Sequence, residues 1–467
     1  MKNLEAPAPR RAAAWARALD RVQWIGPGLV MAATAIGASH LVLAPTAGAA
    51  FGYSLLWLMP FTHVFKYPAF DFGPRYAVAT GETLLDGYAR VPGPRGWALW
   101  AFLAGTVVQG FSVTAGVLSV AAAVAAAAVP GVPFLAWCAG FGLLAAALLW
   151  SGRFDGLSAL SKWMMVVLAV VTTTAFLATP PPSGAWVGLV LPALPPGSIV
   201  LAAAILGWMP TGIDVAIWHS MWARERMAEW DARAAERGGG AAGALDPRTV
   251  RRGVMRYALA DMRIGYGLSF VLAVMFLALG AEVLRPAGSV PQGAAVAVTV
   301  ARLYTDVLGG WMWWPFLLAA FFGMYSTTLG CLDGFPRAFA GTVRRLQREP
   351  ASQAIPREEA PRGPAASDLD RAGGAAYWGF LGAILGLALL EIALLPDPVV
   401  LITVAAVASF LIAPISYTLN TWCVTRRIDD PALRPGRVLV AWAIVGLLCM
   451  AAASALFLAL ELPRWLR

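Results

Sequence analysis

Long apolar segments recur along the whole chain, and they restrict the fold more than any other feature. A helix that crosses a bilayer needs about 20 mainly apolar residues. Inside hydrocarbon every backbone polar group must be paired, which favours helices. We therefore predict an all-α polytopic membrane protein with about eleven transmembrane helices. The segments are 24–46, 54–75, 98–128, 134–151, 158–178, 198–222, 262–283, 311–333, 376–395, 398–423 and 438–460.

The composition excludes a water-soluble protein. Hydrophobic residues make up 59% of the chain and charged residues 13%, whereas soluble domains carry about 25% charged residues. The net charge of +9 is high, but the Lys and Arg residues gather in alternate segments between the apolar ones. The four cysteines have no metal-type spacing. We expect the lipid bilayer as a partner, no nucleic acid and no cofactor.

The distribution of arginine predicts how the chain is oriented. The Arg-rich segments 73–97, 223–261, 334–374 and 424–437 fall on one side, which the positive-inside rule makes cytoplasmic. We expect a bacterial-type inner membrane, a cytoplasmic N-terminus and an external C-terminus. The segments 223–261 and 334–374 are expected to be cytoplasmic loops. The stretch 290–306 alternates enough to form an external amphipathic helix.

Two apolar segments contain Gly, Pro and polar residues near their middle, at 34–40 and 207–214. Broken helices at corresponding positions of two repeats are typical of the binding site of a transporter. Glycine and proline that merely pack helices are the alternative. We predict five-helix repeats at 24–178 and 198–423 and an extra helix within 424–467. This is the LeuT-type inverted-repeat fold, with helices 1 and 6 broken.

Several short motifs resemble the Nramp (natural resistance-associated macrophage protein) family of metal-ion transporters. The resemblance implies the LeuT fold, eleven helices and alternating access around a site between helices one and six. The motifs are Gly26-Pro27-Gly28, Phe51-Gly52-Tyr53, Leu55-Leu56-Trp57, Arg75, Thr80-Gly81, His219-Ser220 and Phe322-Gly323-Met324-Tyr325-Ser326-Thr327-Thr328.

The chain departs from this family at the metal-binding motif. The family has Asp-Pro-Gly-Asn in helix one, where this chain has Gly37-Ala38-Ser39-His40. The family has Met-Pro-His-Asn in helix six, and this chain has Met209-Pro210-Thr211-Gly212, with a register known to within about three residues. Helix three has the polar Gln109 and lacks the acidic residues with which the family carries protons. We expect a divergent member without the metal-binding motif.

The two breaks predict where an ion binds. The positive ends of half-helices, together with hydroxyl groups, make anion sites, and one nearby acid, Asp214, cannot neutralise a dication. The predicted substrate-binding residues are Gly37, Ala38, Ser39, His40, Met209, Pro210, Thr211 and Gly212, with no metal ligands.

Three ionisable residues inside the membrane are predicted to couple transport to a proton or sodium. They are His40, Asp214 and Lys66, because such groups are costly in a bilayer and usually functional. Each also has a structural interpretation. His40 could bond a freed carbonyl, Asp214 could pair with Lys66 or a helix end, and Lys66 could reach towards the cytoplasmic interface.

We predict a secondary active transporter for a small inorganic anion, with bicarbonate as the leading candidate. Coupling to a proton or a monovalent cation is expected. One alternative is a divalent metal transporter for manganese or magnesium, which would use Asp214 and backbone carbonyls. A second is a sensor or scaffold without transport. No catalytic constellation shares one depth, so we do not expect an enzyme.

Overall fold

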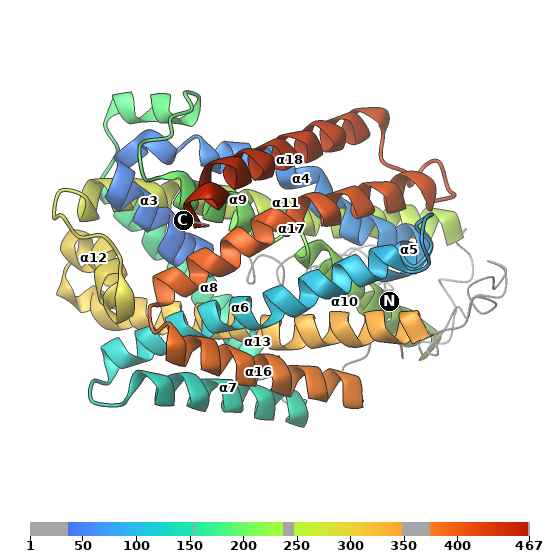
Figure 1. Cartoon of the computed structure of the whole chain (residues 1–467), viewed down its shortest axis with the longest axis horizontal. Coiled ribbons are helices and arrows are strands. Elements are labelled where there is room, and N and C mark those ends of the chain that lie inside the picture. The colour runs from blue at the N-terminus through green and yellow to red at the C-terminus, as the bar shows by residue number, and fades with distance from the viewer. Residues whose placement is uncertain (1–35, 153–154, 237–246, 348–373, 466–467) are drawn as a thin grey trace, which may run out of the picture.

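The computed structural model describes residues 36–152, 155–236, 247–347 and 374–465. All regular elements within these ranges are helices, as predicted. In Figure 1 the long helices run roughly side by side, from α18 at the top to α7 at the bottom. The predicted first span, 24–46, begins outside the described residues.

The first half contains one short π-helical turn, one short 3-10 helix and six α-helices. They are η1 (Ser39–Leu43), α3 (Ala44–Phe51), η2 (Gly52–Leu55), α4 (Leu58–Thr80), α5 (Leu84–Tyr88), α6 (Trp97–Ala128), α7 (Phe134–Ser151) and α8 (Asp155–Ala178).

The second half follows the short 3-10 helix η3 (Ser183–Leu189). Its main elements are α9 (Ile199–Trp208), α10 (Val215–Glu236), α11 (Pro247–Leu279), the π-helical turn η5 (Gly280–Leu284), α12 (Val296–Leu308), α13 (Trp313–Gln347), α16 (Ala375–Leu394), α17 (Pro398–Arg426) and α18 (Arg437–Trp465).

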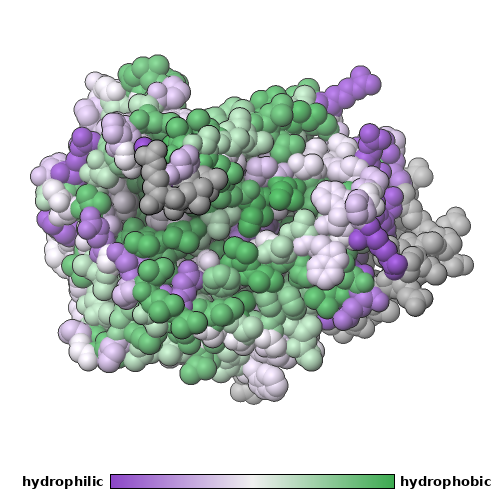
Figure 2. All heavy atoms as spheres, viewed as in Figure 1, coloured by the Kyte–Doolittle hydropathy of each residue, from purple (hydrophilic) through white to green (hydrophobic). Residues whose placement is uncertain are grey.

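The apolar helices make this an integral membrane protein. Among the described residues, 7 helices are long and apolar enough to cross a bilayer, or up to 8 with the pair Ser39–Leu55 and Leu58–Thr80, which is bent by 100°. Two further apolar helices are shorter, at Trp163–Ala178 and Ile199–Trp208. The predicted total of eleven spans stays a prediction. Figure 2 shows hydrophobic residues over the middle of one face and hydrophilic residues towards its ends.

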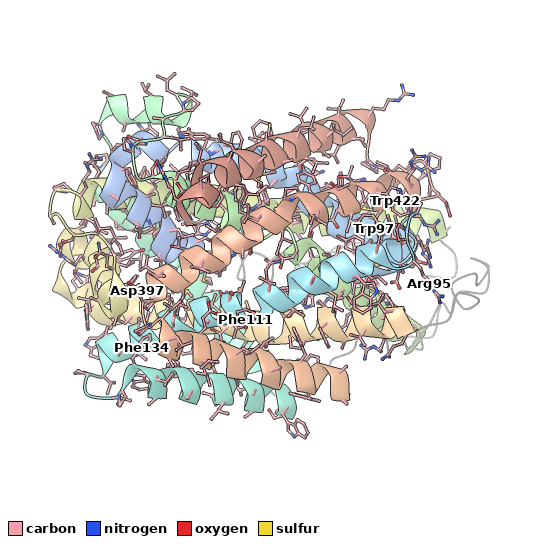
Figure 3. The ribbon with its side chains drawn as sticks, viewed as in Figure 1. Arg95, Trp97, Phe111, Phe134, Asp397 and Trp422 are labelled. Carbon is pink, nitrogen blue, oxygen red and sulfur yellow. The ribbon has the colours of Figure 1, made fainter. Side chains whose placement is uncertain are left out.

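Labelled side chains mark the two ends of the helices. Figure 3 shows Arg95, Trp97 and Trp422 at one end, and Phe134 and Asp397 at the other. The first end belongs to the Arg-rich segments. At the second end the Asp397 carboxylate accepts hydrogen bonds from the backbone N–H groups of Val399 (2.8 Å) and Val400 (3.3 Å), and so caps α17.

Helix α6 lies near the centre of the molecule, against α13, α17, α16 and α7. Helix α4 packs against α10, α11, α17 and α18. The approach of α3 to α11 and η5 depends on glycine. A Cβ at Gly48 would lie 2.0 Å from the Leu277 carbonyl oxygen, and one at Gly280 would lie 2.3 Å from that of Pro45. No larger residue fits either position without moving a backbone.

Two predicted loops are shorter than expected. Within 223–261, α10 continues to Glu236 and α11 begins at Pro247; within 334–374, α13 continues to Gln347. These segments are rich in Ala and Arg, which are good helix formers, so the helices extend past the apolar part. Residues 237–246 and 348–373 lie outside the described ranges. The amphipathic helix predicted at 290–306 is present as α12, but it begins only at Val296, after an extended residue, Gln292, and a short 3-10 turn. Its external location stays a prediction.

Candidate functional site

The break in the sixth span is confirmed. Helix α9 ends at Trp208 and α10 begins at Val215, and residues 209–214 between them are not helical. In the first span the chain bends at residues 36–37 and enters the π-helical turn η1. Residues before this bend lie outside the described ranges. Because η1 packs against α9 and α11, the two breaks lie close together.

A cavity lies between the breaks, with α6, α13 and α17 forming the rest of its wall. The space between its atoms is about 440 Å³, including the part open to solvent. It is lined by Ala38, Ser39, Gln109, Val113, Val117, Trp208, Thr211, Gly212, Asp214, Val215, Trp218, Thr327, Cys331, Phe335 and Ser409.

Some predicted site residues line this cavity and others do not. Ala38, Ser39, Thr211, Gly212 and Asp214 are in its wall. The remaining predicted residues lie behind the wall or beside it, and they are Gly37, His40, Lys66, Met209 and Pro210.

Gly37 lies at the edge of the cavity, next to α13. A Cβ at Gly37 would lie 2.9 Å from Thr327 Oγ1 and 3.3 Å from its Cγ2. Thr327 itself lines the cavity. A side chain at position 37 would therefore start beside the cavity and require a small shift of Thr327.

Lys66 of α4 reaches the break in the sixth span. Its Nζ donates to the carbonyl oxygens of Leu206 (3.1 Å), Gly207 (2.8 Å), Met209 (2.9 Å) and Thr211 (2.7 Å). The side chain is fully buried. Carbonyl oxygens only accept, so four short contacts fit a charged ammonium, which has three N–H donors. The expectation that Lys66 extends towards the membrane interface is wrong, because the broken helix offers it better acceptors inside.

Asp214 supplies a negative charge in the cavity wall. Asp214 is only 8% exposed, and its carboxylate interacts electrostatically with Lys66. A Cβ at Gly212 would lie 2.3 Å from Asp214 Oδ1, so glycine at 212 makes room for this carboxylate. The charges at the sixth break are thus one ammonium behind the wall and one carboxylate in it.

His40 is directed away from the cavity. Its Nδ1 lies 3.0 Å from Ser39 Oγ, and its Nε2 lies 3.0 Å from both the carbonyl oxygen and the hydroxyl oxygen of Ser269 on α11. The carbonyl that His40 binds belongs to α11 and not to a broken helix. The His40 ring therefore does not line the cavity in this structure.

One polar contact across the cavity wall corresponds to no sequence motif. Trp208 Nε1 donates to Ser409 Oγ (3.0 Å), and Ser409 Oγ donates to Gln109 Oε1 (2.6 Å). Ser409 and Gln109 are buried polar residues in apolar helices, a pattern that indicates function. The sequence alone does not show that α17 and α6 bring them together.

The described residues do not form an obvious metal site. Among them, no group of three or more His, Cys, Asp or Glu side chains is placed to hold a metal ion. Cys331 and Asp214 line the cavity, and the carbonyls of the sixth break already bind Lys66.

Solved structures of membrane transporters share this fold. A manganese transporter of Eremococcus coleocola superposes with a TM-score of 0.65 at 14% identity, covering 97% of this chain and 88% of that one. Mhp1, a nucleobase-cation-symport-1 family transporter, gives a TM-score of 0.52 at 14% identity in its inward-facing conformation, with 95% and 90% covered. At these identities the similarity establishes the LeuT-type fold alone.

Sequence similarity extends over most of the chain. An uncharacterised protein of Pasteurella multocida (strain Pm70) is 28% identical over 339 residues, which are 69% of this chain and 71% of that protein. Residues 28–459 match the family described as natural resistance-associated macrophage protein-like. This match spans both breaks and every helix described above except the last six residues of α18. The chain therefore belongs to the Nramp family and is a membrane transporter.

Proposed function

We propose that this protein is a secondary active transporter whose central site takes a small inorganic anion, with bicarbonate as the first candidate. Transport is coupled to a proton or a monovalent cation. The observation that carries the proposal is the Lys66 ammonium, bound to four backbone carbonyls of the sixth break.

The Lys66 ammonium neutralises the negative end of one half-helix and leaves the positive end of the other facing the cavity. The carbonyls at the C-terminus of α9 are the negative end of that half-helix, and Lys66 neutralises them. The positive N-terminal end of α10 begins at Val215, which lines the cavity. The hydroxyl of Ser39 adds a hydrogen-bond donor to the wall. These donors favour an anion, whereas the Asp214 carboxylate in the same wall opposes it. In this proposal Asp214 therefore binds the coupling proton or cation.

A divalent cation is expected to bind this cavity less favourably than an anion. A unit charge about 5 Å away contributes roughly 3 kcal/mol at an effective permittivity of ~20, and a dication doubles this. What a dication gains from Asp214 it largely loses to Lys66. Little then remains to offset dehydration, since hard dications need several oxygen ligands.

Divalent metal transport is the second candidate, and the relatives favour it over bicarbonate. A solved protein with this fold is a manganese transporter, and no similarity described above points to bicarbonate. In this alternative Asp214, Cys331 and backbone carbonyls would hold the ion. Lys66 would then have to leave the carbonyls that it binds.

Purified protein in proteoliposomes distinguishes the candidates. Uptake of ¹⁴C-bicarbonate and of Mn²⁺ is measured, because symport of bicarbonate with one proton carries no net charge and gives no current. Protein-free liposomes are subtracted to remove passive CO₂ flux. Bicarbonate uptake without Mn²⁺ uptake supports the anion. The reverse supports the metal alternative, and silence in both contradicts transport of either ion.

A further inference from the structure

Two of the three histidines in this chain share one buried serine beside the cavity. Ser269 Oγ on α11 lies 3.0 Å from His40 Nε2 and 3.3 Å from His63 Nε2. All three residues are buried, and they come from η1, α11 and α4. The predicted coupling residue His40 thus belongs to a larger polar cluster that extends behind the cavity wall.

The neighbouring carbonyl groups fix which ring nitrogen of each histidine carries hydrogen. His63 Nδ1 lies 2.8 Å from the Met59 carbonyl oxygen, and His40 Nε2 lies 3.0 Å from the Ser269 carbonyl oxygen. A carbonyl only accepts, so both of these nitrogens must donate. In the neutral rings His40 Nδ1 and His63 Nε2 are then acceptors.

With these tautomers the hydrogen bonds from Ser39 to His63 all point the same way. The Ser39 hydroxyl donates to His40 Nδ1 (3.0 Å). The single hydrogen on His40 Nε2 is shared between the carbonyl and the hydroxyl oxygen of Ser269, and the Ser269 hydroxyl donates to His63 Nε2. His63 Nδ1 donates to Met59. Because Ser39 lines the cavity, the series begins at the proposed ion site and ends inside the protein.

We propose that Ser39, His40, Ser269 and His63 hold the coupling proton, an inference that rests on the proposed transport function. A proton from the cavity binds Ser39 Oγ, and the Ser39 hydroxyl passes its own proton to His40 Nδ1. His40 Nε2 passes its proton to Ser269 Oγ, and the Ser269 hydroxyl passes its own to His63 Nε2. His63 becomes an imidazolium, and the reverse steps return the proton when the cavity opens to the other side.

The surroundings limit how long His63 stays charged. Lys66 lies one helical turn further along α4, and His40 faces from η1; both interact electrostatically with His63. From α11, Tyr266 places its ring 5.3 Å from the His63 ring and donates to the His63 carbonyl. No carboxylate in the described part of the chain is hydrogen-bonded to either ring. The like charge on Lys66 favours release of the proton.

Nitrogen NMR of the full-length protein in liposomes tests this cluster without any substrate. The chain is labelled with ¹⁵N-histidine, and His40→Gln, His63→Gln and His219→Gln assign the three residues. We expect hydrogen on Nε2 of His40 and on Nδ1 of His63, and we expect His63→Gln to change the titration of His40. The same tautomer in both rings, or an unchanged His40 titration, overturns the proposal.

Transport assays give the second test, with bicarbonate as the probe. Ser269→Ala removes the shared hydroxyl and keeps the carbonyl that binds His40; Ser269→Thr keeps the hydroxyl. We expect Ser269→Ala to lower pH-driven accumulation at least about tenfold, in line with the loss of a positioned proton donor. Bicarbonate exchange without a pH gradient should persist in this variant.

The matched control is His219→Gln. His219 is also buried, in α10, and its Nδ1 has no hydrogen-bond partner within the described ranges. Accumulation by His219→Gln should equal that of the wild type. Equal losses in Ser269→Ala and His219→Gln contradict the proposal. If the wild type moves no bicarbonate, the proposed function fails, and the NMR titration still decides the proton cluster.

Discussion

The bend at Gly37 and the break between α9 and α10 occupy corresponding positions in the LeuT fold, and they are stabilised differently. At the first, the Gly37 carbonyl accepts from the backbone N–H groups of His40 (3.1 Å) and Leu41 (3.0 Å). At the second, the carbonyls bind the ammonium of Lys66. The bend at Gly37 is stabilised by neutral hydrogen bonds within its own segment. The break between α9 and α10 is stabilised by a charged side chain from a different helix, α4.

Helix α4 serves both positions. His63 connects through Ser269 to the first, and Lys66, three residues later, reaches the second. Residues three apart lie on one face of a helix, so one face of α4 sets the charge near both. The breaks provide the geometry of the site and the Asp214 carboxylate, and α4 provides the positive charge of Lys66.

Loss of the lysine charge should have the largest effect. Lys66→Met keeps most of the side-chain volume and leaves four buried carbonyls without their donor. Each unsatisfied group costs about 1–3 kcal/mol, so we expect the free energy of unfolding to fall by more than about 4 kcal/mol. Thermal unfolding in detergent measures this.

A control one turn earlier on α4 is Thr62→Val. The Thr62 hydroxyl donates to the Met59 carbonyl in its own helix (3.1 Å) and lies 3.3 Å from His63 Nδ1, and the loss of these neutral contacts should cost about 1 kcal/mol. Equal costs for Lys66→Met and Thr62→Val would show that the ammonium does not hold the sixth break together.

Adding a negative charge at the first position should have the next largest effect. Gly37→Asp places a carboxylate beside the cavity, and one charge about 4–5 Å from an ion is worth roughly 3–4 kcal/mol at an effective permittivity of ~20. We expect bicarbonate flux to fall by a factor of a few hundred, as measured in proteoliposomes.

The neutral variants Gly37→Asn and Gly37→Ala separate charge from size. All three side chains require the same shift of Thr327, so Asn and Ala should impair flux much less than Asp. Equal losses would make the effect steric. Unchanged flux in every variant would mean that the ion does not pass residue 37.

A third charged contact, far from both breaks, should affect stability and not ion preference. Burial alone would raise the pKa of Asp86 in α5, but Arg345 of α13, 2.8 Å away, lowers it below its usual value. A lowered pKa stabilises the fold above the unfolded pKa of about 4 and loses this effect as pH falls through the folded value.

Arg345→Gln should therefore destabilise the protein by about 2 kcal/mol at pH 7, the typical value for a hydrogen bond to a charged group. It should also make unfolding begin at a higher pH during acidification, because the buried carboxyl then protonates more readily. Thermal unfolding between pH 4 and 8 measures both. An altered ratio of bicarbonate to Mn²⁺ uptake would contradict the proposed role of Lys66 in ion preference.

The neutral contact across the cavity wall should have the smallest effect. Ser409→Ala removes the acceptor of Trp208 and the donor to Gln109, and we expect a loss of about 1 kcal/mol. Thermal unfolding and flux measured together should show a modest change in each. A loss as large as that of Lys66→Met would place the decisive contact on α17 instead of α4.

Hydropathy and helix-breaking residues predicted most of the fold. The apolar segments located the helices, and the Gly and Pro residues at 207–214 located the break between α9 and α10. The helix ends were less predictable, because α10 and α13 continue through polar residues that also favour helix. Apolar length reports only the part of a helix inside the membrane.

The candidate site was only partly predictable, because its charges depend on which helices pack together. The sequence placed Lys66 and Asp214 near mid-membrane, but not the four carbonyls that Lys66 binds. His63 and Ser269 gave no motif at all, since they are separated by 206 residues. Such contacts follow from the packing of α4 on α11, which periodicity within one helix does not determine.

We propose that the Lys66 ammonium and the missing acid at Gly37 exclude a dication from the cavity. Anomalous diffraction at the manganese edge, from crystals of the full-length protein with Mn²⁺, tests it most directly. We predict no anomalous peak between residues 37–40 and 209–214, and in calorimetry no affinity better than about 1 mM, or about 4 kcal/mol. A peak coordinated by Asp214 and the carbonyls that now bind Lys66 would contradict the claim and establish the metal alternative.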